Sequence, residues 1–187
     1  MPTVLCLHGR RQCGLTFANK LFPNAPTSTS ASGLVTVSLP QLDFVFPNAP
    51  FTSQANLPKG FKPKSTSGKC SSPSLFSWWG ETNEDDGSTA LNSLAKLLQD
   101  TQPVGVVGFS QGGALAASLC RKQSSLDFAV FLSSYYVLTP QEEKSGVFTP
   151  PALIRFQPQD EFPPRIRSLH CFSDTDQVVG MQFLGLD

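Results

Sequence analysis

Five short, almost unbroken runs of Val, Leu, Ile and Phe constrain the fold of this chain more than any other feature. An unbroken apolar run, unlike an alternating one, is typical of a strand buried on both faces, as in a parallel sheet. Helical patterns stand between several of the runs, and this order is typical of an α/β protein with a mainly parallel sheet. We therefore expect interior strands at Thr3–Leu7, Leu42–Phe46, Val104–Gly108, Phe128–Ser133 and Ser168–Phe172.

Two helices are predicted to flank the strand Val104–Gly108. The first, Ser88–Gln99, carries one apolar stripe at i, i+3, i+4 and i+7, which consists of Leu91, Leu94, Ala95 and Leu98. The second covers about residues 111 to 123 and ends in two cations, which favour the negative end of a helix dipole. With helices on both faces of the sheet, the predicted architecture has three layers.

The 187 residues are expected to form a single domain, since domains average roughly 150 residues. Two segments do not resemble the rest of that domain. Asn24–Pro40 is rich in Ser, Thr, Ala and Pro, and Phe51–Cys70 is rich in Pro, Lys and Ser. Compositions of this kind predict loops or insertions.

The charge balance excludes several classes of partner. The 14 Lys and Arg residues offset the 14 Asp and Glu residues, so no summed positive field attracts nucleic acid or an anionic bilayer.

No apolar run approaches the roughly 18 residues that a membrane span requires. The N-terminus also lacks the basic and small-residue features of a secretory signal.

The cysteines and histidines indicate the compartment and argue against a metal site. Five cysteines are an odd number, and none are spaced as CxxC, so reduced thiols in a cytoplasmic protein are expected. Only two histidines are present, and no set of four ligands at zinc spacing can be assembled.

The sequence Gly108-Phe109-Ser110-Gln111-Gly112 matches the G-x-S-x-G pattern of a nucleophile elbow. A predicted strand precedes it and a predicted helix follows, which is the context in which such a turn exposes a serine hydroxyl at the sheet edge. Glycines flank the turn because side chains there would collide in its strained geometry. We therefore expect Ser110 to be a nucleophile at the edge of a cleft.

Two further segments fit the same chemistry. After the first strand, His8-Gly9-Arg10 allows the backbone N–H of Arg10 to turn toward the nucleophile, where it and the N–H of Gln111 can hold an oxyanion. His8 itself is not assigned as a base. After the last predicted strand, Asp176 is preferred to Asp174 as the acid of a triad in the order Ser, Asp, His.

Together these segments resemble a known family. LCLHGRRQCG, FVFPNAPF, GFSQGGALAA, LHCFSDTDQVV and the tryptophans of Ser77–Trp79 look like serine hydrolases of the α/β-hydrolase fold, the group that contains the ovarian-cancer-associated esterase of animals. The resemblance implies a carboxylesterase or thioesterase acting on a small-molecule ester or acyl substrate, with no metal and no organic cofactor. It makes Ser110 the nucleophile, Asp176 the triad acid, and the N–H groups of Arg10 and Gln111 the oxyanion donors.

Three departures from the family pattern stand out. No histidine follows His170, so no residue matches the family's catalytic base. Ser173 and Ser134 stand where the family generally has glycine. Three interpretations remain: an esterase truncated at its C-terminus, a hydrolase-like protein that binds acyl ligands or protein partners without turnover, or an enzyme with another base. The sequence predicts no oligomeric state.

Overall fold

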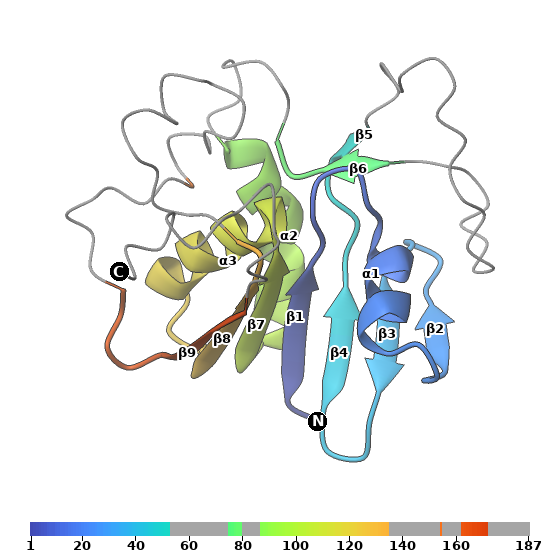
Figure 1. The fold of residues 1–187 in the computed structure, drawn as a ribbon, viewed down its shortest axis with the longest axis horizontal. Coiled ribbons are helices and arrows are strands. Elements are labelled where there is room, and N and C mark those ends of the chain that lie inside the picture. The colour runs from blue at the N-terminus through green and yellow to red at the C-terminus, as the bar shows by residue number, and fades with distance from the viewer. Residues whose placement is uncertain (53–74, 80–86, 135–153, 155–161, 172–187) are drawn as a thin grey trace.

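The computed structural model describes residues 1–52, 75–79, 87–134, 154 and 162–171. In these ranges seven strands form one sheet in the order β2-β3-β4-β1-β7-β8-β9, shown in Figure 1. Strands β4, β1, β7, β8 and β9 run parallel to one another, whereas β3 pairs antiparallel with both β4 and β2. The strands are β1 (Thr3–Leu7), β2 (Thr27–Thr29), β3 (Val35–Ser38), β4 (Asp43–Phe46), β7 (Gly105–Phe109), β8 (Phe128–Leu132) and β9 (Arg167–Cys171).

The mainly parallel α/β sheet predicted from the sequence is confirmed. All five predicted strands are present, each within one residue of its expected bounds. One expectation is wrong: β9 is not an interior strand, because it ends the strand order of the described residues and four of its five residues are exposed. Its sequence, RSLHC, offers few apolar side chains to bury.

The prediction of a loop or insertion at Asn24–Pro40 is also wrong in part, because β2 and β3 lie within it. Val35 and Val37 are 2% and 0% exposed, whereas Thr36 and Ser38 between and after them are more exposed. This alternation is the pattern of a strand buried on one face. The Ser- and Thr-rich composition of the segment predicted a loop in place of this strand, although Thr itself favours strands.

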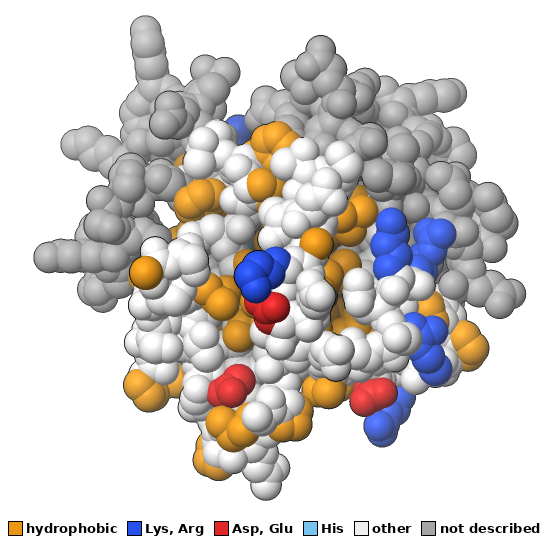
Figure 2. Space-filling view, turned by 180° about the vertical axis from the view of Figure 1, so that it is seen from behind, with side chains coloured by type: hydrophobic (Ala, Val, Ile, Leu, Met, Phe, Trp, Pro, Cys, Tyr) orange, Lys and Arg blue, Asp and Glu red, His pale blue; other side chains and the backbone are white. Residues whose placement is uncertain are grey.

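Helices cover both faces of the sheet. The helix α1 (Gly14–Leu21), which the sequence analysis did not predict, packs Phe17 and Ala18 against one face of the sheet, which β1 lines with Val4 and Cys6. The helices α2 (Ser88–Thr101) and α3 (Gln111–Lys122) pack against the other face, which β1 lines with Leu5 and Leu7. Figure 2 views the molecule from the α2–α3 side, where apolar side chains lie among polar ones. The three predicted layers are therefore present.

The buried stripe of α2 differs slightly from the predicted one. Leu94 and Leu98 are buried as expected, and Ala90 joins them. Ala95 is exposed instead, and Leu97 packs partly against the core. The stripe is thus rotated by a small angle around the helix axis, and Leu91 remains partly buried at its border.

A second, two-stranded sheet lies above the carboxyl ends of β1 and β4 (Figure 1). Its strands, β5 (Phe51–Thr52) and β6 (Phe76–Ser77), pair antiparallel. Phe51–Thr52 belongs to the segment expected to be a loop, and residues 53–70 of that segment lie outside the described residues. This small sheet borders the place where the site residues gather.

Candidate active site

Ser110 stands between the last residue of β7 and the first residue of α3. Its backbone has φ 51° and ψ −117°, a conformation that a residue with a Cβ rarely adopts. Two hydrogen bonds hold the turn: Ser110 N–H donates to the Leu132 carbonyl at 3.0 Å, and Gly113 N–H donates to the Ser110 carbonyl at 2.9 Å. The residue is partly exposed, so the sharp turn presents it at the carboxyl edge of the sheet.

Glycines allow this turn to pack tightly. A Cβ on Gly112 would overlap the carbonyl oxygens of Leu7 and His8, and one on Gly108 would lie 2.5 Å from the Gly113 Cα. These contacts are with backbone atoms, which cannot move aside. The first turn of α3 therefore lies directly against the end of β1.

The loop after β1 lies beside the elbow because of strand register. Leu7 pairs with Gly108 in the parallel ladder between β1 and β7. Residues that follow each strand therefore emerge side by side, with Gly9 two positions after Leu7 and Ser110 two positions after Gly108. A Cβ on Gly9 would lie 2.6 Å from the Phe109 ring, so glycine permits this close approach. The structure thus brings together the segments of Arg10, Ser110 and Gln111.

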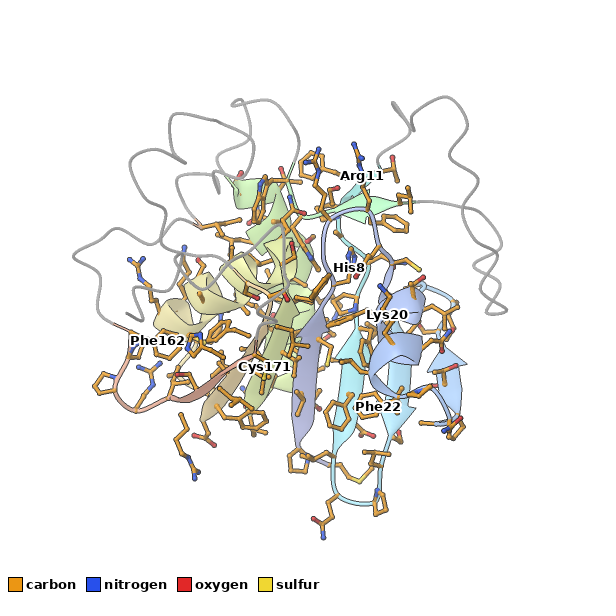
Figure 3. The ribbon with its side chains drawn as sticks, viewed as in Figure 1. His8, Arg11, Lys20, Phe22, Phe162 and Cys171 are labelled. Carbon is orange, nitrogen blue, oxygen red and sulfur yellow. The ribbon has the colours of Figure 1, made fainter. Side chains whose placement is uncertain are left out.

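His8 is fully buried and does not face the site as a base. Its Nδ1 lies 2.7 Å from the Gly9 carbonyl oxygen, and its Nε2 accepts a hydrogen bond from Ala49 N–H at 3.1 Å. Burial lowers the pKa of His8 from its ordinary 6.5 to about 4, against the opposing effect of the bond to Gly9. Both ring nitrogens are therefore engaged in the interior, at the upper end of β1 in Figure 3.

The second histidine, His170, lies two strands away from β7 in the sheet order. It is in β9, opposite Phe131 in the ladder, and its ring is tilted against the Phe131 ring at a centroid distance of 4.8 Å. Burial lowers the pKa of His170. The hydrogen bonds of His8 therefore exclude it as the base of Ser110, and His170 belongs to a strand that lies two positions from β7 in the sheet order.

A hydrogen-bonded network joins the elbow to the loop after β1, and sequence reasoning missed it. The Gln111 side chain accepts a hydrogen bond from Trp78 N–H at 2.8 Å, and the Trp78 indole N–H donates to the His8 carbonyl at 2.8 Å. Trp78 is fully buried, and Gln111 is 2% exposed. In the sequence, Ser77–Trp79 contributes only to the family resemblance, and no motif indicates that Trp78 joins the other two.

Ser134, one of the departures from the family pattern, fits into the same region. Its Oγ lies 3.1 Å from the Gly108 carbonyl oxygen and 3.0 Å from the Leu132 carbonyl oxygen. A Cβ on Gly113 would collide with the Ser134 side chain. The serine thus fills the space that Gly113 leaves over the elbow.

The remaining predicted site residues lie outside the described residues. These are Asp176, its alternative Asp174, and the departure Ser173. Within the described part of the chain, no group of three or more metal-ligating side chains is found. No helix in that part is long and apolar enough to cross a membrane.

Comparisons with known proteins agree with this arrangement. The family model described as "Serine hydrolase (FSH1)" matches residues 1–184. Esterase OVCA2 of Mus musculus is 31% identical over 194 residues, covering 96% of this chain and 78% of its own length. Esterase CG5412 of Drosophila melanogaster is 27% identical over 197 residues, and its match covers 94% of this chain but only 58% of that protein.

Two solved structures resemble the fold. Acyl-protein thioesterase 2 of Zea mays is 22% identical with a TM-score of 0.50, over 97% of this chain and 74% of its own. Esterase PE8 is 20% identical with a TM-score of 0.53, over 98% of this chain and 74% of its own. The predicted α/β-hydrolase fold is thereby confirmed. Because the family model matches nearly all of the sequence and the mouse esterase aligns over most of both chains, this chain belongs to the serine hydrolase (FSH1) family.

Proposed function

We propose that the chain acts on small-molecule carboxylic esters or thioesters, with Ser110 as nucleophile. The observation that carries the proposal is the strained turn of Ser110 at the edge of β7, directly beside the loop that follows β1. Strained backbone conformations at a non-glycine residue gather at functional sites, because the surrounding structure must hold them. One α/β-hydrolase domain, spanning residues 1–187, carries this site.

The backbone around Ser110 suits acyl transfer. Ser110 Oγ attacks the ester carbonyl carbon, and the carbonyl oxygen gains negative charge. The N–H groups of Arg10 and Gln111 hold that oxygen, and Gln111 begins α3, whose positive dipole end stabilises an anion. The alcohol or thiol leaves, and water releases the acyl group from Ser110. The reaction requires neither a metal nor an organic cofactor, and Asp176 is the triad acid by resemblance.

The rate expected of these 187 residues alone depends on the absence of a histidine after His170 among them. Without a base to accept its proton, Ser110 is a hydroxyl of ordinary acidity and a poor nucleophile. Oxyanion donors and substrate binding alone retain roughly 10³–10⁴ of acceleration over water, several orders below a complete triad. The 187-residue chain is therefore expected to turn over slowly. Binding of acyl ligands without turnover is the second candidate function for these residues.

Hydrolysis of a short p-nitrophenyl ester tests the proposal. We expect a slow rate that Ser110→Ala lowers further, because attack by the Ser110 hydroxyl is lost while the oxyanion donors and substrate binding remain. Ser168→Ala, a change at an exposed serine of β9, should leave the rate unchanged. Equal rates for the natural chain and Ser110→Ala would contradict the proposal. If calorimetry then shows binding of a fatty acid, the second candidate function applies.

We also propose a cytoplasmic location and no nucleic-acid partner. The described cysteines are all free, and Cys6, Cys13 and Cys120 are buried. Free thiols are typical of a reducing compartment. The net charge of +0 supports the absence of a nucleic-acid partner.

A further inference from the structure

The peptide unit between Gly9 and Arg10 carries two groups with different partners. Its carbonyl oxygen lies 2.7 Å from His8 Nδ1, and its N–H is the predicted oxyanion donor of Arg10. No described peptide bond is cis, and in a trans peptide the C=O and N–H point in opposite directions. The direction of the carbonyl therefore determines the direction of the Arg10 N–H.

The hydrogen bonds of His8 assign its proton. The Ala49 N–H can only donate, and it lies 3.1 Å from His8 Nε2, so Nε2 must carry a lone pair. A neutral imidazole has one proton, which is then on Nδ1. Burial keeps the ring neutral, since it lowers the pKa of His8 to about 4. His8 Nδ1–H thus donates to the Gly9 carbonyl.

The position of the ring in the sheet gives the peptide its direction. Strand β1 lies between β4 and β7, and Ala49 follows β4. The His8 ring bridges the two segments, since its Nε2 accepts from Ala49 N–H and its Nδ1 binds the Gly9 carbonyl. Seen from Gly9, the carbonyl therefore points toward the ring and toward the β4 side. The opposite end of the peptide unit, the Arg10 N–H, is then directed toward β7, which ends just before Ser110.

The neighbouring peptide unit, between His8 and Gly9, is held as well. Its carbonyl accepts the Trp78 indole N–H at 2.8 Å, and its N–H donates to the Gln12 side chain at 3.2 Å. Glycine has more backbone freedom than any other residue. Side chains therefore restrain both peptide units around Gly9, and His8 is the one that holds the unit with the predicted donor.

The geometry points to His8 as a positioning residue of this hydrolase: its Nδ1–H holds the Gly9–Arg10 peptide so that the Arg10 N–H faces the elbow. The inference rests on the proposed function, in which that N–H binds the oxyanion. His8 touches neither the substrate nor Ser110 in this account. It acts only through the orientation of one peptide.

Two substitutions separate this role from a general effect on folding. His8→Leu removes the Nδ1 donor and keeps an apolar side chain of moderate size, whereas His8→Asn restores an N–H near the Nδ1 position. For His8→Leu we expect kcat for a p-nitrophenyl ester to fall by roughly 10- to 100-fold per folded molecule, because loss of one oxyanion donor costs about 10²–10³. KM should stay nearly constant, and His8→Asn should recover most of the loss.

The folded fraction of each variant is measured by tryptophan fluorescence, and Ser110→Ala is assayed in parallel. A purely structural role would lower the folded fraction of both His8 variants and leave kcat per folded molecule unchanged. That result, with Ser110→Ala slower than the natural chain, would overturn the inference while the proposed function stands. Hydrolysis at the natural rate by Ser110→Ala would overturn the proposed function instead.

A crystal structure of His8→Leu tests the positioning directly, whether or not turnover is measurable. We expect the Gly9 carbonyl to rotate away from its present direction in His8→Leu and to keep that direction in His8→Asn. An unmoved Gly9 carbonyl in His8→Leu would overturn the inference.

Discussion

Strands β1 and β9 are both five residues long and belong to the parallel part of the same sheet, but they are held very differently. Every residue of β1 is buried, and β4 and β7 pair with it on either side. In β9 four residues are exposed, and within the described part of the chain only β8 pairs with it. Burial and strand pairing thus stabilise the centre of the sheet, where the elbow lies, much more strongly than they stabilise β9.

The largest expected effect compares the same substitution in both strands. Leu5 is 1% exposed in β1, and Leu169 is 58% exposed in β9. Leu5→Ala should lower the free energy of unfolding by about 2–5 kcal/mol, because it leaves a cavity in the core. Leu169→Ala should change it by no more than about 0.5 kcal/mol. Urea unfolding measures both, and similar losses would show that β9 is buried in solution.

The second prediction compares the two histidines. Unfolded His8 takes up a proton near its ordinary pKa of 6.5, whereas folded His8 does so at about 4. Between these values the unfolded state binds more protons, so stability falls as the pH is lowered from 6.5 to 4. At about 1.4 kcal/mol per pKa unit, His8 accounts for a loss of roughly 3 kcal/mol.

Substitution separates this contribution from the other titrating groups. His8→Asn should remove most of the slope of stability against pH between 4.5 and 6.5. His170→Asn should remove less of it, since His170 is only partly buried. Urea unfolding at several pH values checks both variants, and an unchanged slope in His8→Asn would show that His8 is not held neutral.

The smallest effect concerns the attachment of the β9 region to α3. One guanidinium nitrogen of Arg165 donates to the carbonyls of Cys120 and Gln123 at 3.3 and 3.0 Å, at the negative end of α3. Arg165→Gln should lower stability by about 1 kcal/mol. Arg167→Gln, at an exposed residue of β9, is the control and should have almost no effect. Equal losses would indicate a general charge effect rather than helix capping.

The same contrast explains how far the sequence could predict the fold. The bounds of β1 were predicted without error, because TVLCL is an unbroken apolar run. The helix α1 escaped prediction because it has only eight residues and its N-cap is Cys13, whose sulfur accepts from Thr16 N–H in place of a usual Ser, Thr, Asp or Asn. Short elements of this kind depend on tertiary packing more than on local signals.

The candidate site likewise contains features that the sequence predicts and features that it does not. The turn at Ser110 could be located from glycine spacing, because those glycines reflect local collisions. The bonds of Trp78 to Gln111 and His8 could not, since they join residues 33 and 70 positions apart in the chain. No local pattern encodes such a contact. The engagement of both ring nitrogens of His8 likewise depends on Ala49, 41 positions away.

Covalent trapping tests the central claim most directly. An alkyl fluorophosphonate phosphonylates an accessible nucleophilic serine with loss of fluoride, and peptide mass spectrometry identifies the modified residue. We predict one adduct, formed slowly because no histidine activates the hydroxyl, on the peptide that contains Ser110, with Ser110 as the modified residue and no adduct in Ser110→Ala. An unmodified Ser110, or an adduct at another serine such as Ser133 that persists in Ser110→Ala, would contradict the assignment of the nucleophile.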